Sequence, residues 1–164
     1  MCIGGIPMLF YGDELAYTND YSYLQDSGKS YDNRWMHRPI MNWERNEKRK
    51  NSSSFEGRIF LATQKLIEIR KSLPILSDHK NITWMTPHNI HVAGFIRHDA
   101  NKKLFCLFNY KQTASYITWY AFKESEVRPS LLKDHWTGKT YPVGNDHEYF
   151  ILDAYQFAIL EIVA

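Results

Sequence analysis

The sequence predicts an α+β fold in two parts, a buried strand with a long helix and then an antiparallel β-sandwich. Three features of the 164 residues indicate this: a short apolar run at 6–11, an apolar stripe at helical spacing over 55–73, and short strand-like runs separated by turns from residue 82 onward. We take the two parts as domains of residues 1–76 and 77–164.

The apolar run at 6–11 has the pattern of a strand buried on both faces of a parallel sheet. Its letters are IPMLFY, and glycines flank it at Gly5 and Gly12. A strand covered on both faces shows no polar alternation. A buried helix segment gives the same run, and this alternative stays open. Asp13 and Glu14 follow the run, at the end of the strand where parallel-sheet enzymes place their functional groups.

A long segment at 15–52 has no sustained periodicity, yet it is crowded with aromatic and basic side chains. Loops of this length inside a compact domain are functional or disordered. Because disordered chains are poor in aromatic residues, we interpret the segment as an ordered binding loop. The side chains that it gathers are Tyr17, Tyr21, Tyr23, Arg34, Trp35, His37, Arg38 and Trp43.

A helix is expected from residue 54 to residue 73. Residues Ser53 to Glu56 match a capping box, in which the serine hydroxyl and the glutamate carboxylate each bind a free amide of the first turn. Pro74 supplies the stop. The apolar residues recur at alternating steps of four and three, so they form one stripe that we expect to be buried: Phe55, Ile59, Ala62, Leu66, Ile69 and Leu73.

After residue 82 the chain is typical of an antiparallel sandwich or meander. The tetrapeptide at 99–102, DANK, predicts a hairpin turn, and WTGK at 136–139 predicts another turn. The strand-like runs lie at 91–97, 104–110, 116–122 and, as a final pair, within 149–163.

Composition and charge exclude several classes of partner. The formal net charge is +2 and the longest basic run is short, from Arg45 to Lys50, so no nucleic-acid partner is expected. No apolar stretch is long enough to cross a membrane, so no membrane partner is expected either. Cys2 and Cys106 are the only cysteines, which implies no disulfide framework. Cys106 lies in an apolar run and should behave as a small buried hydrophobe.

We expect no metal and no cofactor. His135 and His147 each stand alone in turn-like surroundings, without the i, i+4 pairing or the cysteine spacing of a metal site. The first five residues lack the order of a signal peptide and resemble the middle of a domain. We therefore expect a fragment of a longer protein. Its compartment is undetermined, with the cytoplasm favoured.

Three segments carry a resemblance to a known family. The sequence GIPMLFYGDE at 5–14 resembles the conserved segment at the eighth barrel strand of the α-amylase superfamily. NDYSY at 19–23 and DNRWMHRP at 32–39 resemble the loop after that strand in amylosucrases and related sucrose-splitting or α-glucan-active members. The later helix and the β-rich region, with DHWTGK at 134–139 and AYQFAILE at 154–161, agree with the same family.

The resemblance implies retaining cleavage or transfer at an α-glucosidic bond, in sucrose or an α-glucan. The family uses an aspartate nucleophile, a glutamate acid/base and a further sugar-binding aspartate. These residues follow barrel strands four, five and seven, which would all precede Met1. We therefore expect no catalytic residue here. Residues 1–76 would be the last strand, the active-site loop and the last helix of a (β/α)8 barrel.

The carboxylates that do occur near these positions are not assigned to catalysis. Asp13 and Glu14 are adjacent at a predicted strand end, so their side chains diverge. We expect Glu14 to have a structural role or to lie at the rim of the substrate site. The tripeptide RHD at 97–99 resembles the His-Asp motif of the family's seventh strand, but it enters a predicted hairpin turn, which is the interpretation we favour.

Four residues are candidates for substrate binding: Arg34, Glu14, Asp20 and Arg38. The resemblance gives Arg34 the central role, since the arginine of this motif pairs with an upstream aspartate at the bottom of the glucosyl pocket in amylosucrase-like enzymes. A guanidinium can hold a carboxylate and a sugar hydroxyl in one plane. Arg38 is the competing assignment, and an ordinary loop arginine is a third. Asn33 departs from the serine that the family often has.

Two functions from different classes stay open. The parent protein would be a hydrolase or transglucosidase with an α-glucoside substrate, or the chain would be a non-catalytic carbohydrate-binding or interaction module using the aromatic residues of 17–43 or the β-domain. A purely structural role is a third possibility. Because a strand at 6–11 needs neighbours on both edges, we also expect a homo-oligomer formed through residues 1–20.

Overall fold

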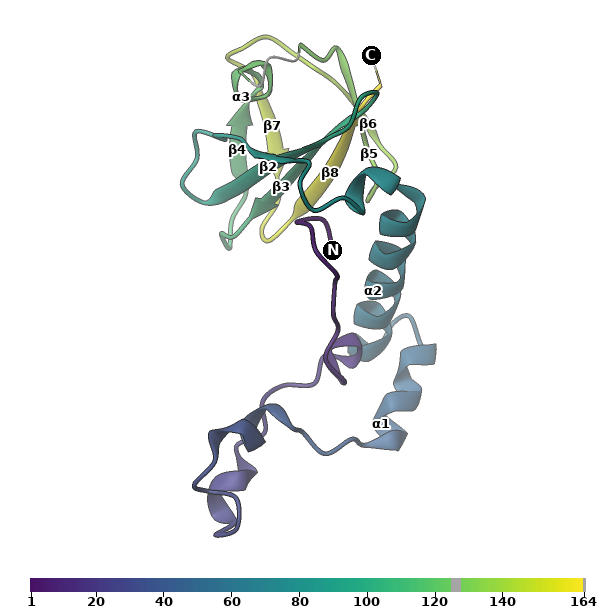
Figure 1. The fold of residues 1–164 in the computed structure, drawn as a ribbon, viewed down its shortest axis with the longest axis vertical. Helices are drawn as coiled ribbons and strands as arrows, with labels where there is room; N and C mark the ends of the chain where they lie inside the picture. Colours follow the sequence, from purple (N-terminus) through teal and green to yellow (C-terminus); the bar gives the residue numbers. More distant parts are fainter. Residues whose placement is uncertain (125–127, 164) are drawn as a thin grey trace. The chain divides into compact units, whose positions relative to one another are not determined.

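The computed structural model describes residues 1–124 and 128–163, which fall into two compact units. The helical unit is Ile6–Glu68, and the β unit joins Met1–Gly5 to Ile69–Ala164. Helix α2 (Phe55–Ser72) belongs partly to each (Figure 1). Since the division lies within this helix, the domain boundary after residue 76 stays a prediction.

Short helices separated by turns make up most of the loop expected at 15–52. Two of these helices have a side-chain N-cap. Asp32 accepts a hydrogen bond from the backbone N–H of Arg34, and Asn42 accepts one from the backbone N–H of Arg45. None of these helices is long enough to produce a periodic pattern in the sequence. They are η1 (Asp13–Leu15), η2 (Ser22–Gln25), η3 (Asn33–His37), α1 (Trp43–Glu47) and η4 (Lys48–Lys50).

The strand expected at residues 6–11 does not form. These residues belong to no strand or helix, and the side chains of Ile6 and Met8 are 90% and 88% exposed. A strand is held by hydrogen bonds to a neighbouring strand. Within the part of the chain that the structure describes, no segment pairs with this one. The alternative of a buried helix is excluded by the same exposure.

Helix α2 begins and ends within one residue of the predicted bounds. Its cap differs, because Ser54 Oγ accepts a 2.9 Å hydrogen bond from the backbone N–H of Gly57, so Ser54 rather than Ser53 is the N-cap. Glu56 is then one position too early for the reciprocal bond of a capping box. Its carboxylate instead accepts a 2.8 Å hydrogen bond from Arg45 Nε.

The apolar stripe of α2 is buried only near its C-terminal end. Ile69 and Leu73 are buried, the three residues in the middle of the stripe are partly buried, and Phe55 is 55% exposed. Burial of the whole stripe was therefore a wrong expectation. An apolar stripe is buried only where other side chains cover it, and spacing alone does not say how far that cover extends.

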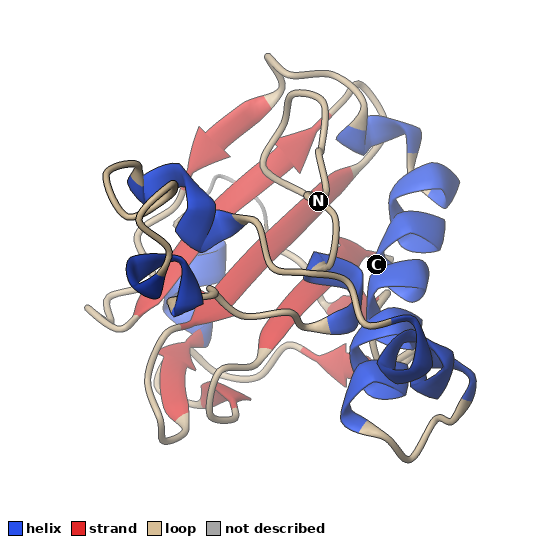
Figure 2. Cartoon of the chain, turned by 90° about the horizontal axis from the view of Figure 1, so that it is seen from below, coloured by secondary structure: helices blue, strands red, loops and turns tan. Residues whose placement is uncertain are grey.

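The β unit confirms the predicted antiparallel architecture. Six strands form one antiparallel sheet in the order β1-β2-β3-β8-β5-β6, and β4 pairs with β7 in a second, smaller sheet (Figures 1 and 2). The strands are β1 (Ile82–Trp84), β2 (Val92–His98), β3 (Lys103–Asn109), β4 (Ser115–Thr118), β5 (Leu131–Asp134), β6 (Thr140–Pro142), β7 (Tyr149–Leu152) and β8 (Phe157–Ile162).

Both predicted turns form where the sequence placed them. In the β2–β3 hairpin, Asp99 Oδ1 accepts hydrogen bonds of 2.8 Å from the backbone N–H groups of Asn101 and Lys102. His98 ends β2 and Asp99 enters the turn, so the RHD tripeptide belongs to a hairpin, as expected. Between β5 and β6, Gly138 has φ of +76°, a conformation that glycine adopts without steric cost.

The third predicted strand is only half correct, because the run at 116–122 changes from strand β4 to the short helix α3 (Trp119–Lys123). Trp119 and Phe122 are three positions apart in the helix, so both rings lie on one face of it. Phe122 packs against Phe105 with ring centroids 5.1 Å apart, and Trp119 packs against Phe150 at 5.7 Å. Core packing therefore selects the helix over a longer strand.

The main core lies between the two sheets, and residues 1–5 lie on the opposite face of the large sheet. Ile96 and Phe105 are paired across β2 and β3 and belong to the core cluster. Neighbouring side chains of a strand point to opposite faces, so Arg97 and Cys106 face away from this core. There Arg97 Nη1 donates a 2.8 Å hydrogen bond to the backbone carbonyl of Cys2.

Candidate functional site

A cavity of about 300 Å³ in the helical unit gathers two of the four residues predicted to bind substrate, Asp20 and Arg38. The 3-10 helices η2 and η3 supply parts of its lining. The backbone N–H of Asp20 donates a 2.8 Å hydrogen bond to the carbonyl of Met36, which holds the two sides together. The other lining residues are Ser22, Tyr23, Gln25, Asp26, Lys29, Trp35 and Ile40.

The cavity is polar and carries charges of both signs. Asp20 Oδ1 accepts a 2.9 Å hydrogen bond from the backbone N–H of Ser22, and side-chain and backbone hydrogen bonds from Ser22 lower the pKa of the Asp20 carboxyl. Trp35 has two cations near its ring, Arg38 Cζ at 5.1 Å and Lys29 Nζ at 5.2 Å from the centroid. A carboxylate, a guanidinium and an indole ring are groups that can bind sugar hydroxyls and stack on a pyranose.

Arg34 and Glu14 do not line this cavity. The Arg34 side chain is 73% exposed and its guanidinium binds the Asp32 carboxylate at 2.8 to 3.0 Å. Hydrogen bonds from Arg34 lower the pKa of Asp32 to about 2, with the side-chain bonds contributing most. Glu14 Oε2 accepts a 3.0 Å hydrogen bond from the backbone N–H of Gly12 and so closes a local turn. The structure thus brings together Asp20 and Arg38, and gives Arg34 and Glu14 local partners.

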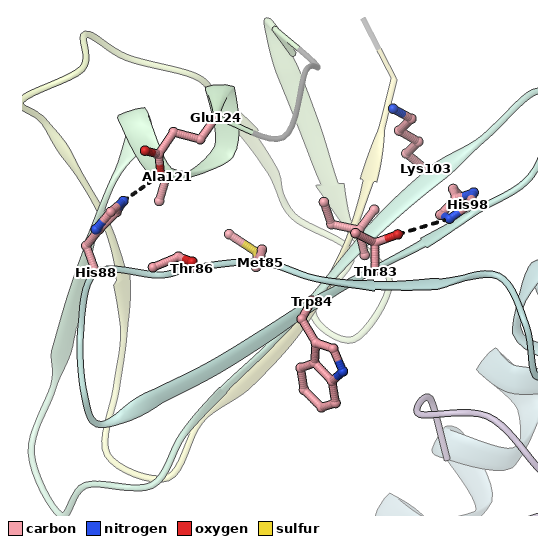
Figure 3. Close-up of a pocket in the computed structure, with 10 residues that line it drawn as sticks. Thr83, Trp84, Met85, Thr86, His88, His98, Lys103, Ala121 and Glu124 are labelled. Carbon is pink, nitrogen blue, oxygen red and sulfur yellow. Dashed lines mark hydrogen bonds and ion pairs between the residues drawn. The ribbon is translucent and has the colours of Figure 1, made fainter.

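A larger cavity, of about 540 Å³, lies in the β unit (Figure 3). His88 Nε2 and Glu124 Oε2 are 2.5 Å apart at one part of its lining, and Thr83 Oγ1 is 3.2 Å from His98 Nε2 at another. The Trp84 ring points away from the other labelled side chains (Figure 3). Sequence reasoning missed this cavity, since its residues have no shared motif and come from three paired strands, the segment between β1 and β2, and helix α3 with the residue after it.

The residues at 1–124 and 128–163 contain no group of three or more histidine, cysteine, aspartate or glutamate side chains placed to hold a metal ion. Among the same residues, no helix combines the length and apolar character needed to span a membrane.

Comparison with known proteins gives a likeness of fold. No family model matches the sequence. An α-amylase from Anoxybacillus superimposes with a TM-score of 0.60 and 20% identity, over 96% of this chain and 29% of that one. AmyP, solved in complex with maltose, superimposes with a TM-score of 0.57 and 18% identity, over 66% of this chain and 21% of that one. The chain therefore shares its fold with part of these two proteins and spans less than a third of their length.

Proposed function

We propose that this chain is the C-terminal part of a retaining α-glucosidic hydrolase or transglucosidase that acts on sucrose or an α-glucan. The observation that carries the proposal is the likeness of fold between nearly the whole chain and 29% of the Anoxybacillus α-amylase. Residues 1–76 would then be the last strand, active-site loop and helix of a (β/α)8 barrel, and residues 77–164 its C-terminal β-domain. The motifs at 5–14 and 32–39 support the same assignment.

Exposed apolar side chains in the helical unit support this assignment. Ile6, Met8 and Phe10 are 90%, 88% and 51% exposed, although they belong to a run with the pattern of a buried strand. A contiguous apolar surface of this kind marks a site of interaction. In a complete barrel the run would pair with strands on both edges and be covered on both faces.

In the complete enzyme we assign substrate binding to Arg34, Glu14, Asp20 and Arg38, and catalysis to residues outside this chain. The guanidinium of Arg34 is accessible, since its side chain is 73% exposed and binds the carboxylate of Asp32, the N-cap of the same short helix. Arg34→Ala would lower kcat/KM by about 10²-fold or more with the fold intact, because a charged contact is lost inside a desolvated sugar pocket. A crippling Arg38→Ala together with a mild Arg34→Ala would reverse this assignment.

An activity assay on the isolated chain tests directly whether the catalytic residues lie outside it. Retaining cleavage needs a nucleophile and an acid/base about 5 Å apart, and we expect this chain to release no glucose from sucrose, maltooligosaccharides or nitrophenyl α-glucoside above a heat-killed control. Glucose release that falls in Asp13→Asn or Glu14→Gln would show a catalytic pair within the chain and overturn the proposal. Sequencing the transcript upstream of the Met1 codon is the second test, and an open reading frame without a barrel would also overturn it.

A non-catalytic carbohydrate-binding module is the second candidate, and the cavity with Asp20, Trp35 and Arg38 favours it. Titration of the isolated chain with maltose and sucrose, followed by NMR, tests this candidate. Binding that is lost in Trp35→Ala and kept in Trp84→Ala, in a transcript that encodes no barrel, would establish it. Trp84 is a matched control because it is 65% exposed and lies in the other unit.

We propose that the isolated chain forms a homo-oligomer through residues 1–20, because its exposed apolar run would otherwise remain in water. Light scattering at micromolar concentration should report a dimer or larger species, and Met8→Asp should shift it toward the monomer. A monomer in the unmodified chain would contradict this proposal.

A further inference from the structure

Three polar side chains from neighbouring strands line one end of the 540 Å³ cavity in the β unit: Thr83 of β1, His98 of β2 and Lys103 of β3 (Figure 3). Lys103 is paired directly with His98, so their Cβ atoms lie about 5 Å apart. Thr83 Oγ1 is 3.2 Å from His98 Nε2. Residues two apart along a strand share a face, so His98 and Lys103 face the same side as the core residues Ile96 and Phe105. Strand register thus places these polar groups together beside the core.

The Lys103 ammonium has no partner of its own. Among residues 1–124 and 128–163 it makes no hydrogen bond and no ion pair, although the residue is partly buried. Such a cation gains from a negatively charged ligand, because charges attract more strongly where water is partly excluded. The described lining of the cavity holds one carboxylate, Glu124, and its Oε2 lies 2.5 Å from His88 Nε2. The end of the cavity at Lys103 is therefore cationic.

The other end of the cavity is formed by His88 and Glu124 (Figure 3). His88 has φ of +54°, a conformation that residues other than glycine adopt rarely, and its imidazole binds Glu124. Asn89 Nδ2 joins the same segment to β4 through a 3.1 Å hydrogen bond to the carbonyl of Tyr116. These contacts fix this end without a ligand. Together with the nearby hydroxyl of Thr86, it offers donors and acceptors to the hydroxyl groups of a ligand.

We propose that this cavity binds a sugar phosphate, with the phosphate at Thr83, His98 and Lys103 and the sugar toward His88 and Glu124. A phosphate monoester carries a charge of about −1.5 to −2 at neutral pH, and lysine binds phosphate as a point charge. When His98 donates through Nε2 to Thr83, the hydroxyl hydrogen of Thr83 is left for a phosphate oxygen. A carboxylate carries less charge and is matched best by the fork of an arginine, which the described lining does not contain.

The size of the cavity indicates a hydroxylated body attached to the phosphate. A volume of about 540 Å³ lies within the range of about 300–1,000 Å³ that is typical of small-molecule sites. Inorganic phosphate would occupy only the end at Lys103. Met85 and Ile96 supply apolar lining for the carbon face of a sugar ring, while Thr86 and Glu124 can bind its hydroxyls. All the described lining belongs to the β unit, so the inference does not rest on the proposed glucosidic activity.

Titration of the isotope-labelled 164-residue chain with glucose 6-phosphate, followed by NMR, tests the proposal. This probe has no α-glucosidic bond, so its binding does not report on the proposed substrate site. We expect saturable shifts at backbone amides around the cavity. The Kd should be at least about tenfold lower than for inorganic phosphate, glucose or glucuronate. Inorganic phosphate tests the anion alone, glucose the sugar alone, and glucuronate a carboxylate in place of the phosphate.

Variants assign the two ends of the ligand. Lys103→Gln should raise the Kd of glucose 6-phosphate about tenfold or more, because a charge-assisted hydrogen bond is lost. Lys133→Gln is the matched control and should change the Kd by less than about twofold, since Lys133 is an exposed lysine of β5 on the opposite face of the sheet from its core neighbour Leu132. Thr86→Val should weaken glucose 6-phosphate about threefold and leave the affinity for inorganic phosphate unchanged.

Several results would overturn the proposal. These are the absence of saturable shifts up to about 10 mM glucose 6-phosphate, shifts confined to residues 6–68, or equal losses in Lys103→Gln and Lys133→Gln. Inorganic phosphate or glucuronate that binds as tightly as glucose 6-phosphate would refute the assigned ligand. The spectrum of each variant checks that the fold is retained. Lys103→Met, which removes the charge and keeps a long side chain, serves the same test if Lys103→Gln does not fold.

Discussion

Asp134 at the end of β5 is the residue whose substitution best tests the packing of the β unit. Its carboxylate is 1% exposed and accepts four hydrogen bonds. Oδ1 accepts from the backbone N–H groups of Trp136, at 3.0 Å, and Ile159, at 3.1 Å. Oδ2 accepts from the backbone N–H of Thr137, at 3.1 Å, and from its hydroxyl, at 2.6 Å. One side chain therefore joins the β5–β6 turn to strand β8.

The expected loss of unfolding free energy follows from the hydrogen-bond donors that Asp134→Ala leaves without an acceptor. The N–H of Ile159 is buried and would lose its acceptor, which costs about 1–3 kcal/mol. The turn amides of Trp136 and Thr137 are partly exposed, so water can replace the carboxylate there. Losing these two hydrogen bonds should cost about as much as losing a helix N-cap, about 1 kcal/mol. We expect the free energy of unfolding to fall by about 2–4 kcal/mol.

Asp134→Asn is the matched control, because it keeps the shape and one oxygen. The amide oxygen can replace Oδ1 and keep the bonds to Trp136 and Ile159, while the NH2 group faces the N–H of Thr137. The cost should be smaller, about 1–2 kcal/mol. Urea unfolding followed by tryptophan fluorescence measures both. If Asp134→Ala stays within about 0.5 kcal/mol of the unmodified chain, or if Asn costs as much as Ala, the hydrogen-bond argument fails.

Three further predictions concern the helix cap, a buried carboxylate and the buried arginine. Ser54→Ala should lower the free energy of unfolding by about 1 kcal/mol, measured by urea denaturation, because it removes the cap of α2. Burial raises the pKa of Glu161, but hydrogen bonds from Lys102 and His135 outweigh it, so the folded pKa lies below 4.5. This stabilisation is present above the unfolded-state pKa and is lost as pH falls through the folded-state pKa. The difference in unfolding free energy between the unmodified chain and Glu161→Gln should therefore shrink below about pH 4.5. A difference that stays constant with pH would contradict this prediction. Arg97→Met should expose the segment 1–5 to limited proteolysis, and Arg97→Lys, with fewer donors, should do so to a lesser degree; equal protection in all three proteins would count against the role of Arg97.

Local patterns predicted the elements whose hydrogen bonds lie within a short stretch of chain. Helix α2 follows from its spacing and its stop at Pro74, and the β2–β3 hairpin follows from the DANK turn at 99–102. In both cases the bonds join residues near in sequence, so the sequence pattern contains most of the information. The cap of α2 was placed one residue early, since two adjacent serines satisfy the same pattern and only the geometry chooses Ser54.

Sequence patterns failed where the secondary structure or burial of a residue depends on the segment that packs or pairs against it. The run at 6–11 has the composition of a buried strand, but a strand exists only with a partner, and the described chain supplies none. Phe55 is 55% exposed, although its spacing is that of a core residue. The run at 116–122 becomes half strand and half helix, since Phe122 reaches the core only through the helical turn.

The sequence by itself determined the α+β class, helix α2, the β2–β3 hairpin, the final pair of strands β7 and β8, and the resemblance at 5–39, because periodicity, turn residues and motifs are local properties. Only the tertiary structure placed Asp20 and Arg38 in one cavity, gave Arg34 a local carboxylate partner, and set the carbonyl of Cys2 against the buried Arg97. These neighbours are far apart in sequence or chosen by competition among several partners. Their contacts depend on strand register and on the path of loops, which the spacing of residues along the chain does not contain.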